Sequence, residues 1–199
     1  MTFNDSCMVR IMEFLDEAGT SENYAFLDDD PRAAVKKAFD LGLECILKCQ
    51  IGVDDTLKVW CAQHDEVTLA PTKARSYELA SLSGAESAGI LRLLMSIDEP
   101  SSEVIRSVKA GVAWSESTKI KGYRYRRSTS DPALTKDPSA SPLWARFSEI
   151  ETNRPFFCDR DGVKKYDIMK IGSERRRGYS LFSNAGEKVA QAFTQWPHR

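Results

Sequence analysis

The sequence lacks several features that would place it in a broad class of proteins. It contains no apolar run near the ~20 residues of a membrane-spanning helix, and no basic-then-apolar signal segment follows Met1. Its 28 basic and 29 acidic residues leave a net charge of only −1. A nearly neutral chain has no overall electrostatic attraction for nucleic acids or membranes, so we expect neither as a partner.

Residues that bind zinc or act as nucleophiles are also scarce. The chain has 2 histidines, His64 and His198, and neither HExxH nor paired CxxC spacing. Its 5 cysteines are an odd number at no framework spacing, so at least one stays unpaired and no disulfide can be predicted. Cys61, His64 and Asp65 are close enough in sequence to form a zinc or Cys–His site, but this is the less favoured interpretation.

What the sequence does contain is helical patterning. Apolar residues at helical spacing and capping residues at their ends predict five helices. These cover residues 5–19, 31–49, 84–95, 101–114 and 185–195, and Ser83 with Glu86 forms a capping-box pattern before the third. No strand–helix alternation or internal repeat interrupts them. The pattern therefore predicts an all-α fold of successive helical hairpins.

Irregular segments separate these helices. Residues 59–84 show neither the helical nor the strand spacing of apolar residues, and they contain Pro71. They are rich in polar and aromatic residues, which is typical of a functional loop. KIKGYRYRR, residues 119–127, places basic residues beside tyrosines, and a helical nucleic-acid or protein-interaction module is the rival interpretation that it supports. Residues 128–142 hold prolines and serines and predict an irregular surface excursion.

Several distinctive sequence motifs occur in order along the chain. They are TFND, WCAQHDEVTLAP, KARSYELASLSGAES, PLWARF, TNRPFFCDRDG and ERRRGYS, which together span about Thr2 to Ser180. In these motifs the sequence resembles polysaccharide lyase family 10, the pectate lyases. The resemblance implies an (α/α) toroid of helical hairpins with long irregular loops. It also implies a monomeric, secreted or periplasmic enzyme that cleaves polygalacturonate by calcium-assisted β-elimination.

The resemblance also assigns roles to residues. It places the base that takes the C5 proton at Arg75, in APTKARSYE, and carboxylate binders at Arg146 and Arg160, with Arg154 as a third. Arginine suits carboxylate binding because its planar guanidinium can donate two parallel hydrogen bonds to one carboxylate.

The resemblance assigns the role of calcium ligand to Asp5, with Asn4 beside it. Both residues can also simply cap the first helix. His64 and Asp65 either brace the loop before Arg75 or contact the sugar. Trp60, Tyr77 and Trp144 either line the groove or belong to the core.

The sequence departs from the family pattern in two places. Family domains carry further helices and a second calcium aspartate before the first matched residues, so residues 1–199 look like a single, partial catalytic domain truncated at its amino terminus. We expect such a chain to expose apolar helix faces and to be poorly soluble, oligomeric or partly unfolded. Leu181 replaces the tryptophan of the usual GYSWY. An inactive remnant that only binds acidic polysaccharide is therefore an alternative to an active lyase.

Overall fold

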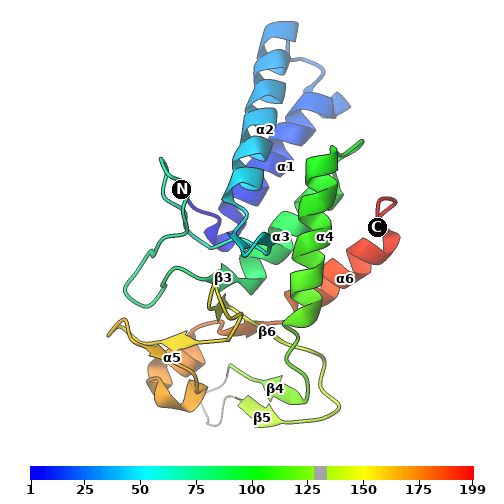
Figure 1. Cartoon of the computed structure of the whole chain (residues 1–199). Coiled ribbons are helices and arrows are strands. Elements are labelled where there is room, and N and C mark those ends of the chain that lie inside the picture. The colour runs from blue at the N-terminus through cyan, green and yellow to red at the C-terminus, as the bar shows by residue number, and fades with distance from the viewer. Residues whose placement is uncertain (128–133) are drawn as a thin grey trace.

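The computed structural model describes residues 1–127 and 134–199; residues 128–133 of the predicted surface excursion lie outside the described residues. Helices dominate the upper part of the molecule in Figure 1. The α-helices are α1 (Cys7–Thr20), α2 (Asp29–Cys49), α3 (Gly84–Met95), α4 (Ser102–Ser117), α5 (Ser173–Gly178) and α6 (Ala185–Gln195), and the 3₁₀ turns are η1 (Asn4–Ser6), η2 (Glu22–Tyr24) and η3 (Ile168–Lys170).

The five predicted helices are confirmed within a few residues of their predicted ends. The capping box before α3 is not formed as the sequence pattern implied. The Ser83 hydroxyl donates a hydrogen bond to the Glu86 carboxylate instead of accepting one from the backbone. Both side chains are buried, and Glu86 is also ion-paired with Arg146, which explains why its carboxylate is drawn away from the helix end.

The all-α toroid prediction is wrong. The described residues form five two-stranded antiparallel sheets among the helices. The pairs are β1 (Gly52–Val53) with β2 (Thr56–Leu57), β3 (Leu82–Ser83) with β7 (Phe147–Ser148), β4 (Tyr123–Tyr125) with β5 (Leu134–Lys136), β6 (Trp144–Ala145) with β10 (Phe182–Ser183), and β8 (Phe157–Cys158) with β9 (Lys164–Lys165). Most of these strands lie in the aromatic-rich segment after α4, where buried loop backbone satisfies its hydrogen bonds in short ladders rather than helices.

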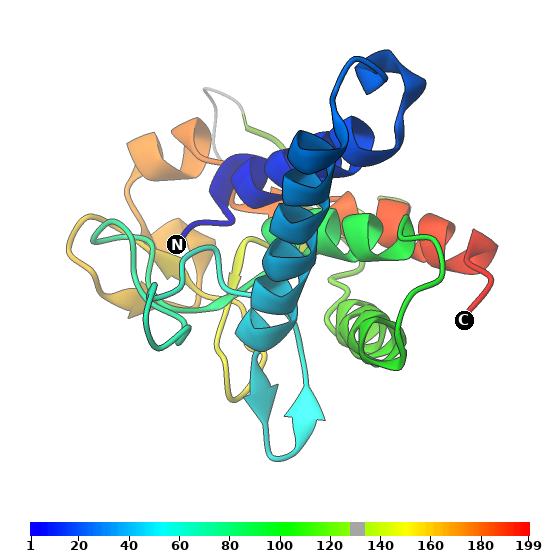
Figure 2. The same cartoon turned by 90° about the horizontal axis from the view of Figure 1, so that it is seen from above.

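Two groups of helices make up the upper part of the molecule. α1 packs along α2 to form a hairpin that projects from the body, while α3 packs against α4 and α6. Seen from above in Figure 2, α3 and α6 run side by side and α2 passes over the body. Most of the strands and α5 lie toward the lower end of the molecule, whereas the β1–β2 hairpin lies at the end of α2, against α4.

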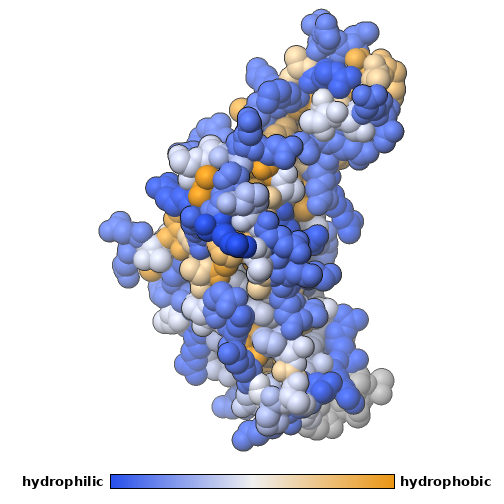
Figure 3. Space-filling view, turned by 90° about the vertical axis from the view of Figure 1, so that its right-hand side faces the viewer, coloured by the Kyte–Doolittle hydropathy of each residue, from blue (hydrophilic) through white to orange (hydrophobic). Residues whose placement is uncertain are grey.

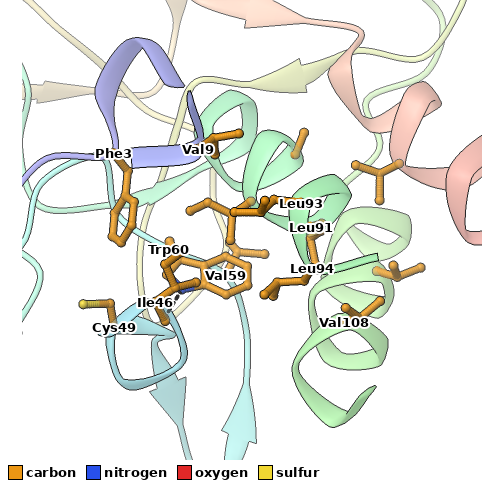
Figure 4. Close-up of a cluster of buried hydrophobic side chains, with 14 of the residues drawn as sticks. Phe3, Val9, Ile46, Cys49, Val59, Trp60, Leu91, Leu93, Leu94 and Val108 are labelled. Carbon is orange, nitrogen blue, oxygen red and sulfur yellow. Dashed lines mark hydrogen bonds between the residues drawn. The ribbon is translucent and has the colours of Figure 1, made fainter. Parts of the chain in front are cut away.

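The main core lies where the helices meet the start of the 59–84 loop. Figure 4 shows Trp60 and Val59 at its centre, between Ile46 of α2 and the leucines of α3. Trp60 is fully buried, and its indole Nε1 donates a 2.7 Å hydrogen bond to the carbonyl oxygen of Ile46. Trp144 is buried as well and donates to Ser115 O at 2.8 Å. Both tryptophans therefore belong to the core rather than to a groove.

A second apolar cluster is formed by residues of the short strands and of η3. It joins Ala145, Phe157, Ile168, Ile171, Leu181 and Phe182. Leu181, the residue that departs from the family motif, is fully buried here. Its side chain thus contributes to packing, as a leucine in place of tryptophan can do without a partner for an indole N–H.

The surface carries a few exposed apolar side chains. The face in Figure 3 is mainly hydrophilic, with apolar residues gathered near its middle and upper end. Large exposed hydrophobic residues on the α1–α2 hairpin and its connection are Ile11, Phe14, Phe26 and Leu41. The low solubility expected from such exposure stays a prediction.

Candidate active site

Short ladders bring three distant segments together below α3. β3, at the end of the 59–84 loop, pairs with β7, and β6 pairs with β10. Arg146 is the residue between β6 and β7; its N–H donates to Leu181 O at 2.8 Å, and its carbonyl accepts from Gly84 N at 3.4 Å. The backbone of Arg146 is thereby fixed between the loop that carries Arg75 and the segment that carries Tyr179.

Arg75 lies on a tight turn and is held by Glu78. The Glu78 N–H donates to Arg75 O at 2.9 Å and the Ala74 N–H to Glu78 O at 3.0 Å. This turn places the guanidinium over the carboxylate: Nε donates to Oε2 and Nη2 to Oε1, both at 2.7 Å. The Arg75 side chain is 56% exposed and that of Glu78 only 8%, so the pair spans from the interior to the surface.

Tyr179 completes this arrangement. Its hydroxyl donates a hydrogen bond to Oε1 of Glu78, 101 residues away in sequence. Burial raises the pKa of Glu78, but hydrogen bonds from Arg75 and Tyr179 outweigh it and lower that pKa to about 2. Burial and the hydrogen bond to Glu78 raise the pKa of Tyr179 to about 12. The hydrogen bonds to Glu78 also raise the pKa of Arg75.

Four arginines surround the rings of Tyr77 and Tyr179. The Cζ of Arg175 lies 3.8 Å from the Tyr77 centroid and 3.5 Å from the Tyr179 centroid. Arg75 and Arg160 lie 5.0 and 5.6 Å from the Tyr77 centroid, and Arg146 lies 4.8 Å from that of Tyr179. We call Tyr77, Tyr179 and these four arginines the arginine–tyrosine cluster. Such contacts hold guanidinium groups close together because the ring faces attract cations.

Two buried donors in the cluster are unused. Arg175 is 8% exposed, and its Nη2 has no hydrogen-bond partner among the described residues, nor does the buried Nε of Arg146. A buried donor without a protein partner costs free energy, and a water molecule or an ion commonly satisfies such an atom. Glu78 and Glu86, the acidic residues closest to Arg75 and Arg146, are already ion-paired with them.

The predicted binding residues are brought together only in part. Arg75, Arg146 and Arg160 meet in the cluster, and Arg160 is 74% exposed with a loose 3.8 Å contact to Glu174. Arg154 belongs to a different group: its Cζ lies 3.7 Å from the centroid of Tyr166, whose hydroxyl donates to Glu149 at 2.6 Å.

His64 and Asp65 lie in the loop before Arg75, in very different surroundings. His64 is 1% exposed, its Nε2 accepts from the Cys61 N–H at 3.2 Å, and its Nδ1 donates to Leu69 O at 2.8 Å. Asp65 is exposed, and its Oδ1 accepts from the N–H groups of Val67 and Thr68. In this arrangement both side chains brace the loop; a contact with sugar stays a prediction.

The thiol of Cys61 does not face His64. It is the Cys61 backbone N–H that meets the imidazole, while Sγ contacts Thr72 O at 3.6 Å, and burial raises the pKa of the thiol. Across residues 1–127 and 134–199, no three histidine, cysteine, aspartate or glutamate side chains gather into a metal-binding group. Neither a Cys–His nucleophile nor zinc therefore fits this loop.

Asn4 and Asp5 lie on the turn before α1, next to the cluster. Asn4 Oδ1 accepts from Arg146 Nη2 at 2.8 Å, and Asp5 is exposed with φ of 52°. Such a conformation is uncommon for a non-glycine residue and is often found at functional sites. Calcium takes 6–8 oxygen ligands. Asp5 offers one carboxylate oxygen of the kind this ion binds, since its Oδ2 already accepts from Asn4 Nδ2, and the Asn4 oxygen is engaged by Arg146. In the described part of the chain no group of three acidic, histidine or cysteine side chains surrounds it.

The basic segment that supported the rival interpretation is tied into the fold. Tyr125 donates through its hydroxyl to Tyr179 O at 2.8 Å, and Arg127 donates to Ser180 Oγ at 2.6 Å. Arg124 forms a 2.6 Å ion pair with Asp137. This segment thus buttresses the chain beside Tyr179, with much of its polar surface already paired.

Comparison with known proteins decides the family. The family model described as pectic acid lyase matches residues 1–190. The chain belongs to this family. None of the curated proteins searched matches it.

Solved structures of a family 10 polysaccharide lyase agree with this assignment. The structure is similar to a family 10 polysaccharide lyase from Cellvibrio cellulosa, with a TM-score of 0.93 and 39% identity over 100% of this chain and 62% of that one. It is also similar to an aspartate-to-alanine mutant of that lyase in complex with trigalacturonic acid, with a TM-score of 0.92 and 39% identity over 98% of this chain and 62% of that one. The chain therefore spans less than two thirds of the length of these relatives.

Sequence reasoning missed important members of the arginine–tyrosine cluster and its surroundings. It assigned no role to Glu78, although an acidic residue three positions after Arg75 is a signal for an ion pair. It grouped Arg175 with Arg176 and Arg177 as one arginine cluster suited to an acidic polysaccharide, and it named Tyr179 only as part of a motif. No local pattern places Tyr179 against Glu78 across 101 residues of sequence.

Proposed function

We propose that this member of the pectic acid lyase family is a pectate lyase that cleaves polygalacturonate by calcium-assisted β-elimination. The observation that carries the proposal is the convergence of Arg75, Arg146, Arg160 and Arg175 on the rings of Tyr77 and Tyr179. Polygalacturonate bears one carboxylate per sugar, and guanidinium forks bind carboxylates two bonds at a time. The mutant relative's trigalacturonic acid complex supports the same class of substrate.

Arg75 acts as the base in this mechanism. It takes the C5 proton of a galacturonate unit, the C5–H electron pair becomes the C4–C5 double bond, and the C4–O bond breaks toward the leaving sugar oxygen, which gains a proton from water. Arg75 must be neutral to accept the proton. Because arginine ionises above pH 12, only a small fraction is neutral at ordinary pH, and the reaction is favoured by alkaline conditions.

The other arginines make the C5 proton easier to remove. Arg146, Arg160 and Arg175 bind the uronate carboxylate next to C5 and stabilise the charge that develops there in the transition state. Of these side chains, Arg160 is 74% exposed and the most accessible, whereas that of Arg146 is only 13% exposed and lies deeper. Arg154 and Tyr166 would contact a more distant sugar of the polymer.

Calcium fits this proposal through Asp5. The Asp5 carboxylate would hold the ion, with further oxygen ligands from the substrate and water, and Asn4 as a neighbour. Bound calcium would supply additional positive charge at the uronate carboxylate. The Asn4–Arg146 hydrogen bond holds the turn at Asp5 beside Arg146. The Asp5 carboxylate and the Arg146 guanidinium would therefore contact the same part of the substrate.

The site also bears on where the protein works and in what form. Polygalacturonate is a cell-wall polymer, so we propose that the protein works outside the cytoplasmic membrane, with residues 1–199 as one partial catalytic domain of a lyase that is monomeric at full length. Among the described residues, the helices do not combine the length and apolar character that a bilayer crossing demands.

Ultraviolet absorbance of the unsaturated product tests this function. The chain is mixed with de-esterified polygalacturonate at alkaline pH, with calcium and then with a chelator. The proposal expects absorbance that grows with calcium and stops with the chelator. A flat trace from folded protein that still binds polygalacturonate would instead support an inactive polysaccharide-binding chain.

A further inference from the structure

Glu78 is the most unusual group of the site, because it is a buried carboxylate beside the residue proposed as a base. Each of its oxygens accepts a hydrogen bond from Arg75, and Oε1 also accepts from Tyr179. A simple surface ion pair would leave both partners free to rotate. Here the carboxylate is 8% exposed and fixed by a tyrosine from another segment.

These hydrogen bonds to Glu78 determine which edge of the Arg75 guanidinium is available to a substrate. Nε and Nη2 are both turned to Glu78, while Nη1 makes no hydrogen bond within the described part of the chain. The exposed side of the guanidinium therefore presents Nη1. A carboxylate that holds one edge of a base also stabilises the positive charge that forms when the base accepts a proton, as the aspartate of a serine-protease triad does for histidine.

We propose that Glu78, held by Tyr179, is the positioning residue of Arg75: it presents Nη1 to the C5 proton and stabilises the guanidinium formed by the transfer. This inference rests on the proposed lyase function and extends it to a residue that contacts no substrate. The proton moves from C5 to Nη1 of neutral Arg75, and Glu78 stays a carboxylate throughout.

Several charged or titratable groups surround Arg75 and set the balance between its neutral and charged forms. The titratable or charged groups around it are Glu78, Tyr77 and Tyr179, with Arg160 and Arg175 against the Tyr77 ring. Glu78 is the one anion in this set at neutral pH, and an opposite charge favours the charged form of arginine. Removing its charge should thus let Arg75 lose its proton at lower pH.

The test compares kcat and KM for the wild type and for Glu78→Gln, Glu78→Asp and Tyr179→Phe. Glu78→Gln should lower kcat by about 10–100-fold through misplacement of the base. Its KM for polygalacturonate should change less than about threefold, because Glu78 contacts no substrate. Glu78→Asp keeps the charge and shortens the reach, so it should lose less kcat than Glu78→Gln, again at a nearly unchanged KM. Tyr179→Phe should lower kcat with little change in KM.

Glu13→Gln, an exposed substitution on α1, is the matched control and should behave as wild type. If Glu78→Gln keeps its kcat, or loses activity through KM alone, Glu78 does not position Arg75 and the inference is wrong. If Glu78→Gln fails to fold in a thermal melt, wild-type kcat in Glu78→Asp would overturn it. A wild-type chain that releases no unsaturated product overturns the proposed function and this inference together.

Discussion

Arg146 Nη2 donates a hydrogen bond of 2.8 Å to Asn4 Oδ1, joining residues that are 142 positions apart. The same nitrogen lies 3.1 Å from the Glu86 carboxylate at the start of α3. One guanidinium thus connects the turn that carries Asp5, the first residues of α3 and the arginine–tyrosine cluster. The proposed calcium ligand and a proposed carboxylate binder are therefore held in one hydrogen-bonded unit.

This connection predicts that Arg146 contributes to stability as well as to binding. In Arg146→Ala the buried carboxylate of Glu86, with a side chain 4% exposed, loses its counter-ion. Removing one partner of a buried ion pair typically costs about 3–5 kcal/mol of unfolding free energy. Urea denaturation measures this loss.

Arg160→Ala is the matched control for Arg146→Ala. Its side chain is 74% exposed, so we expect a change within about 0.5 kcal/mol. Both variants should lose affinity for polygalacturonate. Equal stabilities for the two variants would show that the pair between Arg146 and Glu86 does not hold the fold.

Replacement of Arg75 separates chemistry from binding. Arg75→Ala removes the proposed base but leaves Arg146, Arg160 and Arg175 in place, so release of unsaturated product should fall by at least about 1000-fold. Calorimetric affinity for trigalacturonate should change less than about tenfold. Measurable product formation at a near-wild-type rate by Arg75→Ala would exclude Arg75 as the base.

The helices were predictable because their signals are local. Asp28 to Pro31 at the start of α2 and the spacing of Val104, Val108 and Val112 in α4 fix helical structure without knowledge of distant contacts. The sheets were not predictable in this way. Trp144 and Ala145 pair with Ser183 and Phe182, and a strand of two residues is too short to show a period.

The site was predictable to the extent that shared motifs carried it. The motifs named Arg75, Arg146 and Arg160, and the fold brings them to the same pair of tyrosine rings. Charge and hydrogen bonding of each residue depend on partners that the sequence does not identify. Glu78 has its pKa lowered to about 2 only because Arg75 and Tyr179 both donate to it, and that requires the folded chain.

The buried imidazole of His64 predicts a loss of stability in mild acid. Burial lowers the pKa of His64 below its usual 6.5, so the unfolded chain binds a proton more readily than the folded one. The stabilising effect of neutral His64 is therefore present above pH 6.5 and is lost as the pH falls below it. His64→Gln cannot titrate, so its melting temperature should fall less steeply between about pH 6.5 and pH 5 than that of the wild type. Parallel curves for the two proteins would contradict this role.

Gly186 of α6 is expected to tolerate no side chain. A Cβ atom at this position would collide with the indole ring of Trp144, which is buried between α4 and the strands. Gly186→Ala should therefore destabilise the fold by about 1–3 kcal/mol through overpacking. At Gly178 a Cβ would meet no atom within 4 Å, so Gly178→Ala should leave the unfolding free energy unchanged or slightly raised. Urea denaturation of both variants checks the contrast.

Asp5→Asn tests the calcium proposal without changing the shape of the turn. Asparagine tolerates the positive φ of 52° at this position almost as well as aspartate, so the backbone should keep its conformation. The loss of a carboxylate ligand should raise the half-saturating calcium concentration for product release at least about tenfold. Calorimetric titration of calcium in the presence of trigalacturonate should show the same loss independently of turnover. Asp16→Asn, on the exposed surface of α1, is the control and should match the wild type. An unchanged calcium requirement in Asp5→Asn would place the ion elsewhere, and Arg146 would then bind the uronate carboxylate without a neighbouring metal.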